Sequence, residues 1–137
     1  MYSEINTHFR TKMNNATFLY NGNALPLIWE SDVDGFDGAY IRMALNTNQP
    51  SSSEVGYAGA EEVTGFYQVG FFVPASDKGI DFSLNNLADQ LRVEFRRQSI
   101  VDGDLKVEYL DVERNTPLRI DGMYSCTCRI NFRIFAC

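Results

Sequence analysis

The chain has 137 residues, of which 45% are apolar and 22% charged, with ten Phe and seven Tyr. This size and composition predict a single packed domain, residues 1–137, and exclude wholesale disorder. The net charge of −6 argues against a protein that binds duplex DNA by neutralising its phosphates. Solubility is the simplest interpretation of that acidity. A more specific interpretation is an acidic surface that DNA passes without binding to it.

The N-terminal sequence MYSEINTHFR lacks the basic and apolar regions of a signal peptide. No run approaches the roughly 18 apolar residues that a membrane helix needs. We therefore expect a protein that does not associate with membranes and stays on the cytoplasmic side until a larger assembly is released.

The first predicted element is a helix over residues 3–13, with Ser3 as its N-cap and Ile5, Phe9 and Met13 on one face. A stretch rich in Asn, Gly and Pro then interrupts the pattern. A short strand over residues 25–30 follows and contains Trp29.

The acidic stretch WESDVDGFDGAYIR comes next, with Asp32, Asp34 and Asp37. A calcium loop needs oxygen ligands at positions 1, 3 and 5, Gly at 6 and Glu at 12. Neither register supplies them, whether it starts at Asp32 or at Asp34. A turn that uses Asp and Gly for local hydrogen bonds and positive φ explains the composition, so no metal is expected here.

Residues 39–46 alternate as a strand, with Ile41 and Arg42 on opposite faces. Residues 49–65 are polar and predict a long extended hairpin, for which a mobile loop is the alternative. Residues 64–74 are strongly β-prone and end at Pro74.

A second helix is predicted over residues 76–98, begun by Asp77 or Asp81 and ending in Arg96 and Arg97. Its apolar stripe consists of Leu84, Leu87, Ala88, Leu91 and Phe95.

The remainder predicts two strands, over residues 105–113 and 123–135, with a loop over 115–122 between them. The fold class is therefore α+β, a mainly antiparallel sheet with two helices packed on one face. The expected core comprises Ile5, Phe9, Trp29, Ile41, Tyr67, Val69, Leu87, Leu91, Phe95, Ile130 and Phe132.

Three cysteines without a signal peptide indicate free thiols. Cys126 and Cys128 face the same way on a predicted strand, and buried thiols explain them more simply than a zinc pair that lacks two further ligands. The only histidine, His8, lies on the first helix, and neither cysteine lies at an elbow that would activate it. No phosphate loop or dinucleotide motif is present, so we expect neither an enzyme nor a cofactor.

Several stretches together resemble the tail terminator (tail-completion) family of long-tailed bacteriophages. They are INTHFRTKM, LPLIWE followed by a short turn and GAYIRMAL, EEVTGFYQVGFFVPASDKG, ADQLRVEFRRQ, and the DG before the last strand. Family members commonly carry Ile-Tyr-Gln-Val in the central strand, where this chain has Phe66 to Val69. The chain departs from the family in lacking a Pro after Trp-Glu and in having Glu61 and Glu62 where relatives carry basic or amide residues.

The resemblance implies a homo-oligomeric ring, usually of six copies, that caps the head-proximal end of the tail tube and stops its polymerisation. Its partners would be the tube protein and the head–tail connector or stopper protein, with DNA passing through the lumen without specific binding. The protein would be assembled in the host cytoplasm and reside in the virion at the head–tail junction. Expected subunit or tube contacts are Asp32, Asp34, Asp37, Arg42, Glu54, Tyr57, Glu61 and Glu62. A head-closure or tube component is the alternative, followed by a small cytoplasmic ligand-binding domain.

Overall fold

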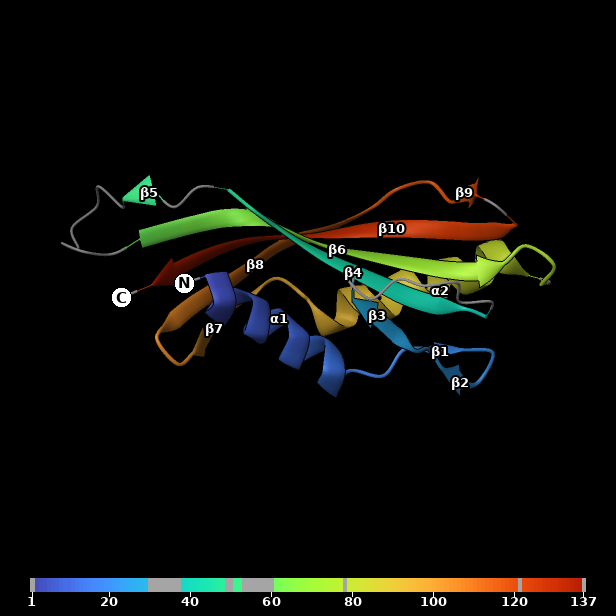
Figure 1. Ribbon diagram of the computed structural model, residues 1–137, viewed down its shortest axis with the longest axis horizontal. Coiled ribbons are helices and arrows are strands. Elements are labelled where there is room, and N and C mark those ends of the chain that lie inside the picture. The colour runs from blue at the N-terminus through green and yellow to red at the C-terminus, as the bar shows by residue number, and fades with distance from the viewer. Residues whose placement is uncertain are drawn as a thin grey trace.

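The computed structural model describes residues 2–29, 38–48, 51–52, 61–77, 79–120 and 122–136. Its helices are α1 (Tyr2–Asn15) and α2 (Ile80–Glu94). Its strands are β1 (Leu19–Tyr20), β2 (Asn23–Ala24), β3 (Leu27–Trp29), β4 (Tyr40–Thr47), β5 (Ser51–Ser52), β6 (Glu61–Pro74), β7 (Gln98–Asp102), β8 (Leu105–Arg114), β9 (Leu118–Ile120) and β10 (Met123–Ala136). Figure 1 shows a long, twisted sheet with α1 running beneath it.

The main sheet has the strand order β3-β4-β6-β10-β8-β7, with β5 and β9 added at the ends of β6 and β10. The central pair, β6 and β10, is antiparallel and in register from Met123 opposite Pro74 to Ala136 opposite Glu61. The pair β3–β4 is parallel, whereas every other described pair in this sheet is antiparallel. A separate hairpin, β1–β2, turns at Asn21 and Gly22, both with positive φ.

Both helices pack on the same face of the sheet, because their buried side chains belong to one hydrophobic cluster with one side of the strands. Alternate residues of β6 and β10 point into this cluster, as their period of two requires. Phe9 of α1 stacks on Tyr67 of β6 at 4.6 Å between ring centroids, and its ring lies 5.0 Å from that of Phe132. The predicted α+β fold is therefore confirmed.

The predicted core side chains are buried, with Trp29 as the exception. Trp29 is half-buried and packs against the edge of the cluster, because its strand β3 is the outermost strand on that side of the sheet. Tyr109 is buried in regular alternation with Leu105 and Val107, whereas the half-burial of Val112 follows from an irregularity in the β8–β10 pairing between Ile130 and Phe132. Such a bulge resets which residues of a strand face the core.

Both predicted helix starts are wrong. Ser3 lies inside α1, where its carbonyl accepts a hydrogen bond from the Thr7 hydroxyl. Helix α2 starts after Gly79, whose φ of 68° is the left-handed conformation that glycine tolerates, and no side chain caps it. Asp77 instead accepts a 2.5 Å hydrogen bond from the Tyr20 hydroxyl, which ties the start of α2 to the β1–β2 hairpin.

Helix α2 also ends earlier than predicted, at Glu94, and the chain enters strand β7 at Gln98. Sequence periodicity did not detect this five-residue edge strand. The predicted loop over residues 115–122 likewise contains a strand, β9, which pairs with the start of β10. In both cases a neighbouring long strand supplies backbone partners that a local pattern does not reveal.

The expected hairpin is partly described. Strands β4 and β6 pair from Tyr40 opposite Phe72 to Thr47 opposite Gly65, and β5 continues the pairing to Ser52 opposite Glu61. The connecting residues 53–60 lie outside the described part of the chain.

Candidate interaction surface

We call the face of the main sheet opposite the helices the open face. It is formed by the residues of β4, β6, β10 and β8 that alternate with the core side chains. The register places Tyr40, Arg42, Ala44 and Asn46 beside the even-numbered residues of β6 and the odd-numbered residues of β10. An antiparallel sheet can leave one face to solvent, and the described open-face residues are exposed or half-buried except for Gly70 and Ser125.

Aromatic rings organise one end of the open face. The rings of Tyr40 and Phe72 stack at 4.8 Å with an interplanar angle of 8°. Gly70 makes room for this arrangement, because a Cβ there would lie 2.9 Å from Cε2 of Phe72. The two half-buried rings form a flat apolar surface of the kind that protein interfaces favour.

Charged groups of both signs occupy the rest of the open face. The Arg129 guanidinium lies 4.3 Å from the centroid of the Phe66 ring. Arg133 donates to Glu108 at 3.0 Å and lies 3.9 Å from Glu62. Exposed pairs of this kind contribute at most about 1 kcal/mol to stability, so they matter more for the surface they present than for the fold.

Exposed apolar side chains extend the open face at two ends. Leu118 is 60% exposed and pairs with Ser125, which in turn pairs with Phe72. Val101 is 76% exposed and pairs with Lys106, beside Phe135. The open face therefore combines aromatic, aliphatic and paired charged groups.

A second apolar surface lies on the helix side of the molecule and is separate from the open face. Phe82 of α2 is 79% exposed and Leu19 of β1 is 50% exposed, and both line a surface cavity of about 420 Å³. Gln90 holds β1 against α2 through hydrogen bonds to the Leu19 amide and carbonyl. We call this surface the Leu19–Phe82 patch.

The structure brings two of the predicted contact residues onto the open face. Arg42 is exposed on β4 opposite Gly70, and Glu62 is half-buried on β6. Glu61 pairs with Ser52 and Ala136 through the backbone. The other predicted contacts lie outside the described residues: Asp32, Asp34, Asp37, Glu54 and Tyr57.

His8 takes part in a partly buried hydrogen-bond chain that the sequence did not predict. Its Nδ1 lies 2.6 Å from Oδ2 of Asp102, and its Nε2 lies 2.5 Å from the Tyr109 hydroxyl. A neutral imidazole satisfies both contacts by donating to Asp102 and accepting from Tyr109. Burial raises the pKa of Tyr109, so this phenol remains protonated and serves as a donor. The chain joins α1 to β7 and β8, which makes it a structural tie.

Cys126 and Cys128 point into the core from β10 and are fully buried. The neighbouring Cys126 sulfur and burial both raise the pKa of Cys128, which keeps this thiol protonated. Among the described residues no group of three or more His, Cys, Asp and Glu side chains could hold a metal ion. Neither described helix is long and apolar enough to cross a membrane.

No family model matches the chain, and no curated protein matches it. Solved structures do match, among them one whose name carries no functional information. It is 18% identical, with a TM-score of 0.63 over 81% of this chain and 79% of its own. At that identity the likeness shows the fold alone.

Proposed function

We propose that this chain is a structural protein that forms a ring on the head-proximal end of a phage tail tube. The ring would end polymerisation of the tube, present a surface to the head–tail connector and leave a channel for DNA. The stretches that resemble tail terminators support this proposal from the sequence. The open face is the structural observation that carries it.

The open face has the composition of a protein contact surface. The Tyr40–Phe72 stack and the exposed Leu118 supply apolar area, while Arg129 lies against Phe66. Aromatic residues and arginine are the types enriched in protein interfaces. Because Arg133 on this face stands beside Glu62 and Glu108, the face suits another protein better than it suits a DNA-repelling lining.

A closed ring also needs two different surfaces on each subunit, since head-to-tail contacts are heterologous. The open face and the Leu19–Phe82 patch meet this requirement, because they lie on opposite sides of the sheet. In this scheme one of the two surfaces of each copy contacts the other surface of its neighbour. The exposed ring of Phe82 is then the apolar anchor of the contact.

The proposal is tested by deleting the gene for this protein from the phage genome. Electron micrographs of the lysate should show tails of excessive and variable length, because tube growth would lack its stop. Tails of normal length beside heads that have lost their DNA would contradict this role and favour head closure.

A further inference from the structure

A cavity of about 550 Å³ lies between α1 and the helix-covered side of the sheet, next to β3 and β4. Its polar lining comes from Asn6 and Arg10 of α1 and from Tyr67 of β6. Its apolar lining includes Trp29, Met43 and Leu45. Both its volume and its mixed lining are typical of a ligand site, and neither open-face contacts nor ring formation accounts for it.

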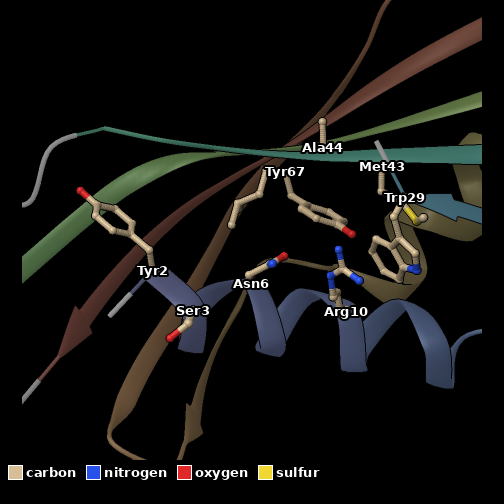
Figure 2. A pocket seen from close by; sticks show the side chains of 9 residues that line it. Tyr2, Ser3, Asn6, Arg10, Trp29, Met43, Ala44 and Tyr67 are labelled. Atoms are coloured by element: carbon tan, nitrogen blue, oxygen red, sulfur yellow. The ribbon is translucent and has the colours of Figure 1, made fainter. Parts of the chain in front are cut away.

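Two residues that line this cavity each carry a buried donor without a hydrogen-bond partner in the described part of the chain. These donors are Nε of Arg10 and the hydroxyl of Tyr67, a residue that is only 1% exposed. Buried polar groups in folded proteins are nearly always paired, so two unpaired donors in one cavity indicate a missing acceptor. Figure 2 shows the Tyr67 hydroxyl, the Arg10 guanidinium and the Asn6 amide directed toward one another beneath the sheet.

Arg10 is the only charged residue among the described residues that line the cavity. None of the described residues that line it is acidic, and within the described chain no carboxylate lies within ion-pair distance of Arg10. The guanidinium instead lies 4.4 Å from the centroid of the Trp29 ring, which holds it in place. Burial raises the pKa of Tyr67, and the positive charge of Arg10 opposes that rise. The Arg10 guanidinium is therefore close enough to the Tyr67 hydroxyl for the two groups to interact electrostatically.

We propose that this cavity binds a carboxylate carried on a short aliphatic stem, as in a glutamate side chain. The carboxylate oxygens accept hydrogen bonds from Nε of Arg10 and the hydroxyl of Tyr67, while Asn6 offers a further amide donor. The stem packs against Trp29, Met43 and Leu45. A planar, singly charged carboxylate matches one guanidinium and one hydroxyl, whereas a phosphate dianion usually requires more donors and cations. This assignment does not depend on the ring proposal.

Trp29 is the only tryptophan in the chain, so its fluorescence reports on this cavity directly. The full chain is titrated with N-acetylglutamate amide and, as the isosteric neutral control, with N-acetylglutamine amide. We expect a saturable change in emission with the glutamate probe, and an affinity for the glutamine probe at least about tenfold lower. An equal response to both probes, no response to the glutamate probe, or tighter binding of inorganic phosphate would overturn the assignment.

Variants separate the site from the fold, with affinities measured by calorimetry. Arg10→Gln and Tyr67→Phe should each weaken binding of the glutamate probe by about tenfold or more. Tyr67→Phe should leave the folded protein intact, because its hydroxyl has no partner to lose. Tyr20→Phe is the matched control, since its hydroxyl bonds to Asp77 outside the cavity, and it should bind the probe normally. Wild-type affinity in both site variants would overturn the proposal.

The source of the carboxylate is decided by comparing the blocked glutamate with the peptide Gly-Gly-Glu-Gly-Gly. Tighter binding of the peptide assigns the site to an acidic side chain of another protein chain. Equal or weaker binding of the peptide assigns it to a small free acid. In both cases the Arg10→Gln variant should lose binding of the probe. Probe binding that survives this substitution would contradict the assignment of the carboxylate to this cavity.

Discussion

His8 and Tyr109, which are 101 residues apart in the sequence, are joined by a 2.5 Å hydrogen bond between the imidazole Nε2 and the phenol oxygen. The contact fixes α1 against β8, while Asp102 holds the other imidazole nitrogen. These two contacts connect the first helix to the C-terminal half of the sheet through polar groups.

Removing this hydroxyl should destabilise the fold. Tyr109→Phe leaves the buried Nε2 of His8 without a donor, which we expect to lower the free energy of unfolding by about 1–3 kcal/mol. Tyr67→Phe removes a buried hydroxyl without a partner and should cost nothing or stabilise slightly. Urea unfolding of both variants measures the difference, and equal losses in the two would refute the structural role of the His8–Tyr109 bond.

Stability should fall in alkaline solution. Burial, together with the hydrogen bond to Asp77 and the charge of that carboxylate, raises the pKa of Tyr20 from 10.0 to about 12. A group that holds its proton more tightly when folded stabilises the fold below the unfolded pKa and loses this contribution as the pH rises. The urea midpoint should therefore decrease between about pH 10 and pH 12. The decrease should be shallower in Tyr20→Phe, and an identical slope would show that Tyr20 is not responsible.

Gly65 should not tolerate a side chain. A Cβ at this position would lie 2.1 Å from the carbonyl oxygen of Asn46 and 3.0 Å from Cζ of Phe132. The nearest of these atoms belongs to the backbone of β4 and cannot rotate away, so the β4–β6 pairing must shift. We therefore expect Gly65→Ala to lower the free energy of unfolding by about 3 kcal/mol or more.

Gly70→Ala provides the matched control on the same strand. Its Cβ would crowd the half-buried ring of Phe72, which can rotate away, while the Arg42 carbonyl oxygen at 3.7 Å is an ordinary contact, so the expected loss is below about 1 kcal/mol. A milder effect at Gly65 than at Gly70, read from thermal unfolding, would contradict the described register near Thr47.

The sequence predicts long elements well where one periodicity extends over many residues. Helix α1 and strand β10 follow from Ile5, Phe9 and Met13 and from the alternation around Ile130 and Phe132, and their core faces are as expected. The short strands β7 and β9 were missed, because they are held by backbone pairing to β8 and β10 and carry little pattern of their own.

The candidate surfaces were harder to predict than the core. Arg42 could be assigned to the solvent side of β4 from alternation alone, whereas the Tyr40–Phe72 stack depends on the register between two strands. The pairing of His8 with Tyr109 and the convergence of Arg10 with Tyr67 are likewise tertiary. Arg10 directly follows the core residue Phe9 on α1, and this position gives no local sign of the cavity that Arg10 lines.

The exposed ring of Phe82 gives the ring proposal a specific test of assembly. Phe82→Ser should prevent the protein from forming rings, since it removes the apolar anchor of the Leu19–Phe82 patch. Val93→Ser is the matched control, because Val93 is also exposed on α2, at 64%, but lies outside the patch. Analytical ultracentrifugation of both variants with the tube protein present distinguishes a patch-specific loss from a general effect of a polar substitution.

The most direct measurement of the central claim is the length of tail tubes polymerised in vitro with increasing amounts of this protein. Purified tube protein is assembled at several molar ratios, and the length of each tube is measured in negatively stained electron micrographs. The proposal predicts that mean tube length falls as the ratio rises and that a ring is visible at one end of the shortened tubes. Tubes whose lengths do not change at any ratio, with no added density at either end, would contradict it.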